Sequence, residues 1–177
     1  MAATPSPDAL PGIAVLEQTP IIIEKIVWAC TDEQMQWKPA MDRWSISEVL
    51  AHLAEAEVIA FRERIRVMIE KNEPQIESYD QNAAYAAGNY SAKKGRESLK
   101  TFCHERDRSL SFLRYVPPTV LARKGQHAKL GPITIGHLMN EWAFHDLGHI
   151  RQIAELYRSR AFYPRSGPFQ QFYTVKP

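Results

Sequence analysis

Four segments of this chain carry apolar residues at helical spacing, and this repetition constrains the fold more than any other feature. The segments cover roughly residues 8–30, 45–71, 91–116 and 134–160. Proline, glycine and asparagine separate them, and no stretch alternates apolar and polar residues for long enough to indicate a strand. Four helices of this length without strands predict an all-α four-helix bundle, in one domain covering residues 1–177.

Local signals mark several helix ends. Ser45 followed by Glu48 fits a capping box, and Thr134 is placed to cap the fourth helix. Thr31 is expected to cap a short helical turn. Pro20 interrupts the first segment and predicts a kink there, since proline removes a backbone donor.

The connections are unusually long. Residues 73–90 and 117–133 are irregular and rich in turn-forming residues, so helices that follow one another in sequence need not be neighbours in space. The aromatic, proline-containing tail over residues 161–177 is expected to pack irregularly on the bundle.

Charge and hydropathy exclude several classes of function. The 22 Lys and Arg residues nearly balance 20 Asp and Glu residues, for a net charge of +2, and residues 93–96 form only a short basic run. Nucleic-acid binding is therefore not expected. No apolar run is long enough to span a membrane, and residues 1–8 do not resemble a secretion signal. We expect a cytoplasmic protein.

The two cysteines, Cys30 and Cys103, lie in helical segments beside apolar residues. There is no Cys-x-x-Cys pair, so a zinc-thiolate site or a disulfide framework is not expected. Both are interpreted as buried thiols.

The strongest chemical signal is the pair His145 and His149. Residues four apart on a helix differ by about 40° in direction and lie one turn apart, so two imidazoles at this spacing can reach one ion. Both lie on the apolar side of their segment, and His52 lies on the apolar side of another. Three histidines leave a coordination position open for water or substrate. The alternative is that each is a core histidine bonded to a backbone carbonyl or a carboxylate.

Residues 44–57 read WSISEVLAHLAEAE, and residues 141–153 read EWAFHDLGHIRQI. Together these two motifs resemble the DinB and YfiT-like superfamily of metal-dependent enzymes. The resemblance implies a bundle with two long crossovers and a divalent-metal site on His52, His145 and His149. Nickel or zinc is the expected ion, with iron as a further candidate.

The resemblance also implies a homodimer. Some members of the family are S-transferases or isomerases that use a low-molecular-weight thiol, and others are described as metal-dependent hydrolases.

Other polar residues are candidates for supporting roles. Glu141, one turn before His145, is a candidate helper that orients this histidine or approaches the metal, and Glu55 is a weaker candidate beside His52. Asp146 points away on the helical wheel and is interpreted as structural or interfacial. Gln152 matches a glutamine of the family motif.

Arg106 interrupts the apolar stripe of the third segment. It is either a helper that binds an anionic substrate group or a partner of a glutamate across the bundle. The remaining histidines are expected to be ordinary residues, namely His104, His127 and His137.

The favoured function is a metal-dependent hydrolase or thiol S-transferase that acts on a small molecule. The alternatives are a non-catalytic, stress-related metal-binding dimer, or a bundle that has lost its site. A ferritin-like di-iron centre is excluded, because its Glu-x-x-His pairs are absent from the sequence.

Overall fold

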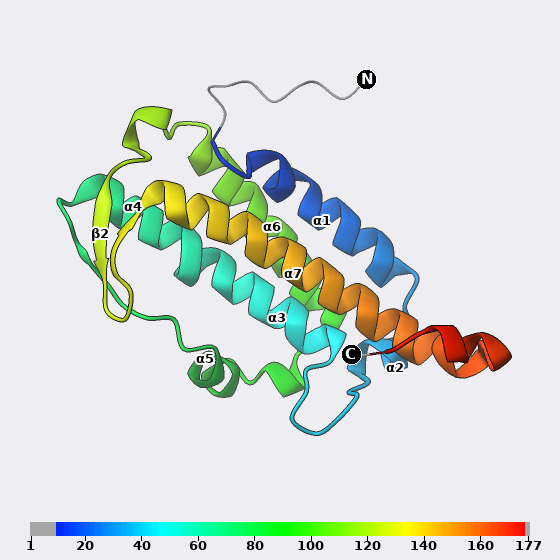
Figure 1. Cartoon of the computed structure of the whole chain (residues 1–177). Coiled ribbons are helices and arrows are strands. Elements are labelled where there is room, and N and C mark those ends of the chain that lie inside the picture. The colour runs from blue at the N-terminus through cyan, green and yellow to red at the C-terminus, as the bar shows by residue number, and fades with distance from the viewer. Residues whose placement is uncertain (1–9, 176–177) are drawn as a thin grey trace, which may run out of the picture.

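The computed structural model describes residues 10–175, and four long helical rods form its body (Figure 1). The rods are α1 (Ile13–Trp28), α3 (Ile46–Ala56) with its continuation, α6 (Gly95–Leu113) and α7 (Ile135–Ala161). A π-helical segment, Glu57–Arg62, continues α3 directly into α4 (Glu63–Glu70). This architecture confirms the predicted all-α four-helix bundle.

The order of helices around the bundle differs from their order in the chain. Helix α3 packs against α6 and α7, and α1 packs against the same two helices. The first two rods therefore occupy opposite corners of the bundle, and helices that follow one another in sequence are not always neighbours in space.

The three predicted helix caps are confirmed, whereas α1 and α6 begin a few residues later than expected. Ser45 and Glu48 form both hydrogen bonds of a capping box at the start of α3. Thr134 caps α7 in the same way with His137. Thr31 caps the short helix α2 (Asp32–Gln36), also through a capping box.

Pro20 lies inside α1, and the helix continues on both sides of it. Its missing N–H would have bonded to the carbonyl of Leu16, four residues earlier. The Leu16 carbonyl instead accepts a hydrogen bond of 2.7 Å from Nη1 of Arg106, on α6. Pro20, which was predicted to kink the helix, thus leaves the Leu16 carbonyl free to accept a hydrogen bond from the buried guanidinium of Arg106.

The expectation of no strands is wrong. Short strands β1 (Gln75–Ile76), β2 (Lys124–His127) and β3 (Gly131–Thr134) form a sheet at one end of the bundle (Figure 1). β1 pairs parallel with β2, and β2 pairs antiparallel with β3. Each strand is only two to four residues long, so alternation of residue type could not reveal it.

The other connecting elements are short. The connection before α6 contains α5 (Gln81–Ala87) and a 3₁₀ turn, Tyr90–Ala92, and a further 3₁₀ turn, Pro118–Val120, precedes β2. None of the helices among residues 10–175 is long and apolar enough to cross a membrane.

The C-terminal tail is irregular, as predicted, but it does not bury its aromatic side chains on the bundle. It forms 3₁₀ turns at Tyr163–Arg165 and Gly167–Phe172, beyond the end of α7 (Figure 1). Phe169, Phe172 and Tyr173 are all exposed.

Two apolar clusters fill the bundle, one at each end. The cluster nearer the sheet includes Leu16, Ile65 and Trp142. The cluster at the opposite end includes Ile23 and Phe102. Buried polar residues lie between these clusters and form the middle layer of the bundle, among them His52, Glu57, Arg106 and Asp146.

Candidate metal centre

Three histidines meet in this middle layer. His52 comes from α3, and His145 and His149 come from successive turns of α7. Nε2 of His145 lies 3.0 Å from Nε2 of His52 and 3.1 Å from Nε2 of His149. One ligand atom from each ring lies within 4.8 Å of the others, as the sequence predicted.

Hydrogen bonding alone does not satisfy these contacts. In the ring plane, Nε2 of an imidazole carries either one hydrogen or one lone pair, so it makes one strong hydrogen bond. Nε2 of His145 faces two other Nε2 atoms at nearly equal distance. A single cation among three lone pairs would satisfy all three rings at once.

The spacing also suits one ion. Two nitrogens that each lie about 2.0–2.1 Å from a zinc ion are about 2.8–3.4 Å apart when they subtend about 90–110°. The separations of 3.0 and 3.1 Å lie within that interval. The residues present therefore fit a divalent metal.

The outward-facing Nδ1 atoms of two of these rings have hydrogen-bond partners that can accept a hydrogen from them. Nδ1 of His149 donates to Oε1 of Gln152 at 2.9 Å. Nδ1 of His52 lies 3.4 Å from the hydroxyl of Tyr79. A hydrogen on Nδ1 leaves the Nε2 lone pair free, as a metal ligand requires.

Burial keeps these rings uncharged. Burial, together with the smaller effects of the neighbouring His149 and His145, lowers the pKa of His52 to about 3. Burial, with His145, lowers the pKa of His149 to about 4. Both rings are therefore neutral at pH 7, with lone pairs available for coordination.

Glu55 reaches His52 only indirectly. Its carboxylate accepts a hydrogen bond of 2.9 Å from the hydroxyl of Tyr90, and that hydroxyl lies 3.4 Å from the hydroxyl of Tyr79. Tyr79 is the residue that contacts His52. Sequence reasoning did not identify Tyr79 as a partner of His52, because Tyr79 lies in the long connection before α6 and has no helical spacing relative to His52.

Glu141 lies at the mouth of the site, with an exposed side chain. It lines a cavity of about 720 Å³ together with His145, Gly148 and His149. The carboxylate nearest to the outward nitrogen of His145 is Asp146, with Oδ1 4.0 Å from Nδ1. The expectation that Glu141 orients His145 is therefore not supported. Glu141 lies at the mouth of the site instead.

Arg106 does not face a substrate cavity. Its side chain is 0% exposed and forms ion pairs with Glu57 at 2.8 Å and Asp146 at 2.7 Å. Burial opposes its charge, but these two carboxylates outweigh that effect and raise the pKa of Arg106. The role as a helper for an anionic substrate is thus wrong, and the alternative of a partner across the bundle is confirmed.

Asp146, interpreted from the sequence as structural or interfacial, is almost fully buried and forms an ion pair with Arg106. Burial would raise the pKa of its carboxyl, but the contact with His145 and the charge of Arg106 outweigh burial and lower it.

Glu57 was missed by sequence reasoning. Its oxygens accept from Nε and Nη2 of Arg106, and Oε2 also accepts from the indole of Trp142.

The remaining histidines lie away from the site. His104 is exposed on α6, His127 accepts backbone hydrogen bonds in the β2–β3 turn, and His137 belongs to the Thr134 cap. These positions agree with the expectation that they are ordinary residues.

The cysteines offer a test of the buried environment. Cys30 is buried and Cys103 is partly buried. Burial raises the pKa of the Cys30 thiol to about 11, against an ordinary value of 9.0. At pH 8 the thiolate fraction of Cys30 is therefore about 100-fold below that of an ordinary thiol.

We expect a thiol-specific disulfide reagent to modify Cys30 at least 100-fold more slowly at pH 8 than it modifies the unfolded chain. The rate should rise about tenfold per pH unit while the fold persists. Variants that retain one cysteine at a time, Cys103→Ser and Cys30→Ser, assign the rates. Modification of native Cys30 as fast as that of the unfolded chain would contradict the buried position.

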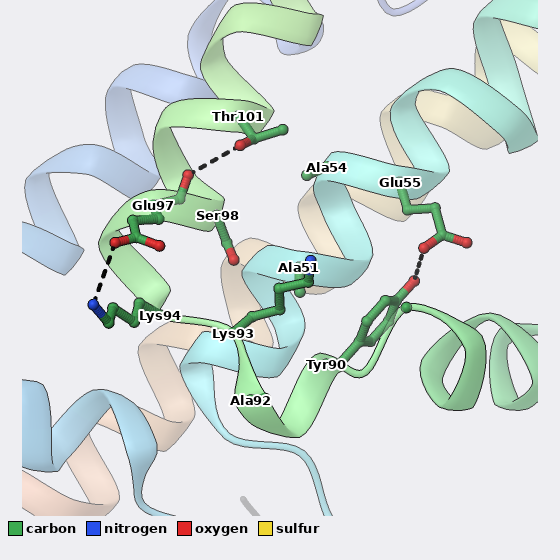
Figure 2. Close-up of a pocket in the computed structure, with 11 residues that line it drawn as sticks. Ala51, Ala54, Glu55, Tyr90, Ala92, Lys93, Lys94, Glu97, Ser98 and Thr101 are labelled. Atoms are coloured by element: carbon green, nitrogen blue, oxygen red, sulfur yellow. Dashed lines mark hydrogen bonds and ion pairs between the residues drawn. The ribbon is translucent and has the colours of Figure 1, made fainter.

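A second cavity, of about 400 Å³, lies between α3 and α6 (Figure 2). Ala51, Ala54 and Ser98 line it, with Glu55 and Tyr90 at one side and Lys93 across it. None of the three clustered histidines lines this cavity. It is therefore separate from the mouth of the candidate metal centre.

Comparison with known proteins adds family context. A family model described as the DinB superfamily matches residues 16–153. A protein of Oceanobacillus iheyensis, named a putative metal-dependent hydrolase, is 27% identical over 142 residues, covering 80% of this chain and 81% of its own.

Among solved structures, YfiT from Bacillus subtilis superposes with a TM-score of 0.76 at 23% identity. The match covers 89% of this chain and 93% of that one. YfiT is described as a probable metal-dependent hydrolase with an unusual four-helix bundle topology. The likeness supports the fold described above.

Proposed function

Because the chain belongs to the DinB superfamily, we propose that it is a metal-dependent hydrolase whose divalent ion is held by His52, His145 and His149. The observation that carries this proposal is the convergence of three Nε2 atoms, two of them 3.0 and 3.1 Å from the third. A relative at 27% identity is named for the same activity.

Three protein ligands are the donor set of reactive rather than closed sites. The bound ion would supply Lewis-acid chemistry, polarising a substrate oxygen and making water a better nucleophile at neutral pH. The side chains of Tyr79 and Gln152 hold two of the rings in place. Imidazole ligands suit zinc or nickel, and we propose one of these ions.

The open side of the site faces the cavity of about 720 Å³ along α7. Gly148 lies between the two histidines of this helix and lines the cavity with them. A Cβ added at Gly148 would meet no other atom within 4 Å. Packing therefore does not require glycine here, although glycine inside a helix costs about 1 kcal/mol relative to alanine. We infer that its small size keeps the approach to the ion open.

Gly148→Leu is expected to leave metal content unchanged and to weaken the binding of an added ligand to the metal by about 5- to 100-fold, because the new side chain crowds the mouth. The measurement is azide titration of the cobalt-substituted protein, followed by its visible spectrum.

Gly148→Ala is the matched control. It should raise the free energy of unfolding by about 0.5–1 kcal/mol and change azide binding little. Equal azide affinity in the leucine variant and the parent would show that the ion is not approached from this side.

The function itself is tested with protein loaded with zinc or nickel and with chelator-treated protein. Ester, amide and phosphoester substrates are assayed, and a low-molecular-weight thiol is assayed with an electrophile. Metal-dependent hydrolysis supports the proposal. Thiol transfer without hydrolysis would favour an S-transferase, and tight metal binding without turnover would favour a non-catalytic module.

A further inference from the structure

We propose that Asp146 is the positioning residue of this metal centre: its carboxylate, fixed by Arg106, orients the His145 ring through Nδ1. The inference rests on the proposed metal site and extends it to the buried ion-pair layer. It assigns a role in metal affinity to a carboxylate that otherwise only balances a buried charge.

The His145 ring lacks the support that the other two rings have. Its Nδ1 is buried and has no hydrogen-bond partner within the described part of the chain. If Nε2 offers its lone pair to an ion, Nδ1 must carry the hydrogen. A buried donor without an acceptor costs about 1–3 kcal/mol, so the ring needs an acceptor there.

Asp146 is the carboxylate placed to accept this hydrogen. Its Oδ1 lies 4.0 Å from Nδ1 of His145, and a relative shift of about 1 Å would bring the pair into hydrogen-bond range. Glu141 is exposed at the mouth of the site and, among the described residues, makes no hydrogen bond with this nitrogen.

Arg106 holds the Asp146 carboxylate in place. Nη1 of Arg106 donates to Oδ2 at 2.7 Å, and Nη2 donates to Oδ1 at 3.1 Å. A guanidinium that binds both oxygens fixes the plane of the carboxylate as well as its position. Oδ1, the oxygen nearer His145, is thereby shared between the two residues.

Arg106 is itself anchored from several sides. It binds Glu57, the first residue of the π-helical segment, through two hydrogen bonds of 2.8 Å. It also donates to the Leu16 carbonyl left free by Pro20, and its guanidinium lies 5.0 Å from the ring centre of Phe102. Contacts from α1, α6 and the π-helical segment therefore determine where the Asp146 carboxylate lies.

The alternative is that this layer only stabilises the fold. The chain offers a matched control, because Glu57 and Asp146 are both about 1% exposed and both bind Arg106, whereas Asp146 alone lies beside a metal-site histidine. Asp146→Asn and Glu57→Gln each remove one negative charge from Arg106 at nearly constant shape.

The experiment measures zinc affinity by competition with a chelator, and stability by urea unfolding, in the full chain and both variants. We expect both variants to lose stability. Asp146→Asn should also weaken zinc binding by about 10- to 100-fold, the range found for partners that orient metal-binding histidines. Glu57→Gln should change zinc affinity less than about threefold.

Equal losses of zinc affinity in the two variants, or no loss in either, would overturn the role of Asp146. If Asp146→Asn does not fold, nitrogen NMR of the zinc-loaded parent decides the question. A slowly exchanging hydrogen on Nδ1 of His145 supports the hydrogen bond, and a rapidly exchanging one refutes it. A parent chain that binds no zinc or nickel would instead refute the proposed function, and the inference with it.

Discussion

His149→Ala is expected to weaken zinc binding by more than about 100-fold, beyond the loss typical of an orienting partner. The substitution removes one of three ligands, and the remaining Nε2 atoms of His52 and His145, 3.0 Å apart, hold an ion from one side only. The free protein should fold normally, since His149 is only partly buried at the mouth of a cavity. Chelator competition gives the affinity, and circular dichroism verifies the fold.

His104→Ala is the control for this measurement, because His104 is exposed on α6 and lies outside the cluster. Its zinc affinity should match that of the parent. Equal zinc affinities in His149→Ala and His104→Ala would mean that the ion binds somewhere other than the three converging rings.

Arg106→Met is expected to lower the free energy of unfolding by about 3–5 kcal/mol, the usual cost of removing one partner from a buried ion pair. The substitution keeps an unbranched chain of similar length but leaves Glu57 and Asp146 buried without their cation. It also removes the hydrogen-bond donor of the Leu16 carbonyl, which has no partner within its helix because Pro20 lacks an N–H. Urea unfolding followed by circular dichroism measures the loss.

Arg66→Met provides a surface comparison. Arg66 also faces two carboxylates, Glu63 and Glu70, but all three side chains are exposed. Ion pairs of this kind contribute about 0–1 kcal/mol, so the loss should be small. A comparable loss in the two variants would mean that the buried layer does not stabilise the fold in the way its geometry indicates.

The sequence was sufficient for the features that depend on local periodicity. The four rods, the caps at Ser45 and Thr134 and the inward faces of His52, His145 and His149 all follow from helical spacing and capping chemistry. The short sheet does not, because β1 pairs with residues about fifty positions later and each strand is too short to show a pattern.

The contacts around the candidate site were harder to predict, because they depend on how far side chains reach and on which helices pack together. A helical wheel gives the direction of each Cβ but not the reach of the side chain. Asp146 points away from His145 on the helical wheel. Its carboxylate oxygen Oδ1 nevertheless lies 4.0 Å from Nδ1 of His145. The stripe on α6 revealed Arg106 as unusual, but its partners come from other rods and only the packed bundle identifies them.

The most direct test of the account is the metal content of the purified chain beside that of the variant with His52, His145 and His149 all replaced by alanine. About one zinc or nickel ion is expected per parent chain, bound by nitrogen ligands in X-ray absorption spectra, and none in the triple variant. A triple variant that retains a full equivalent of metal, or a parent chain that takes up none, would contradict it.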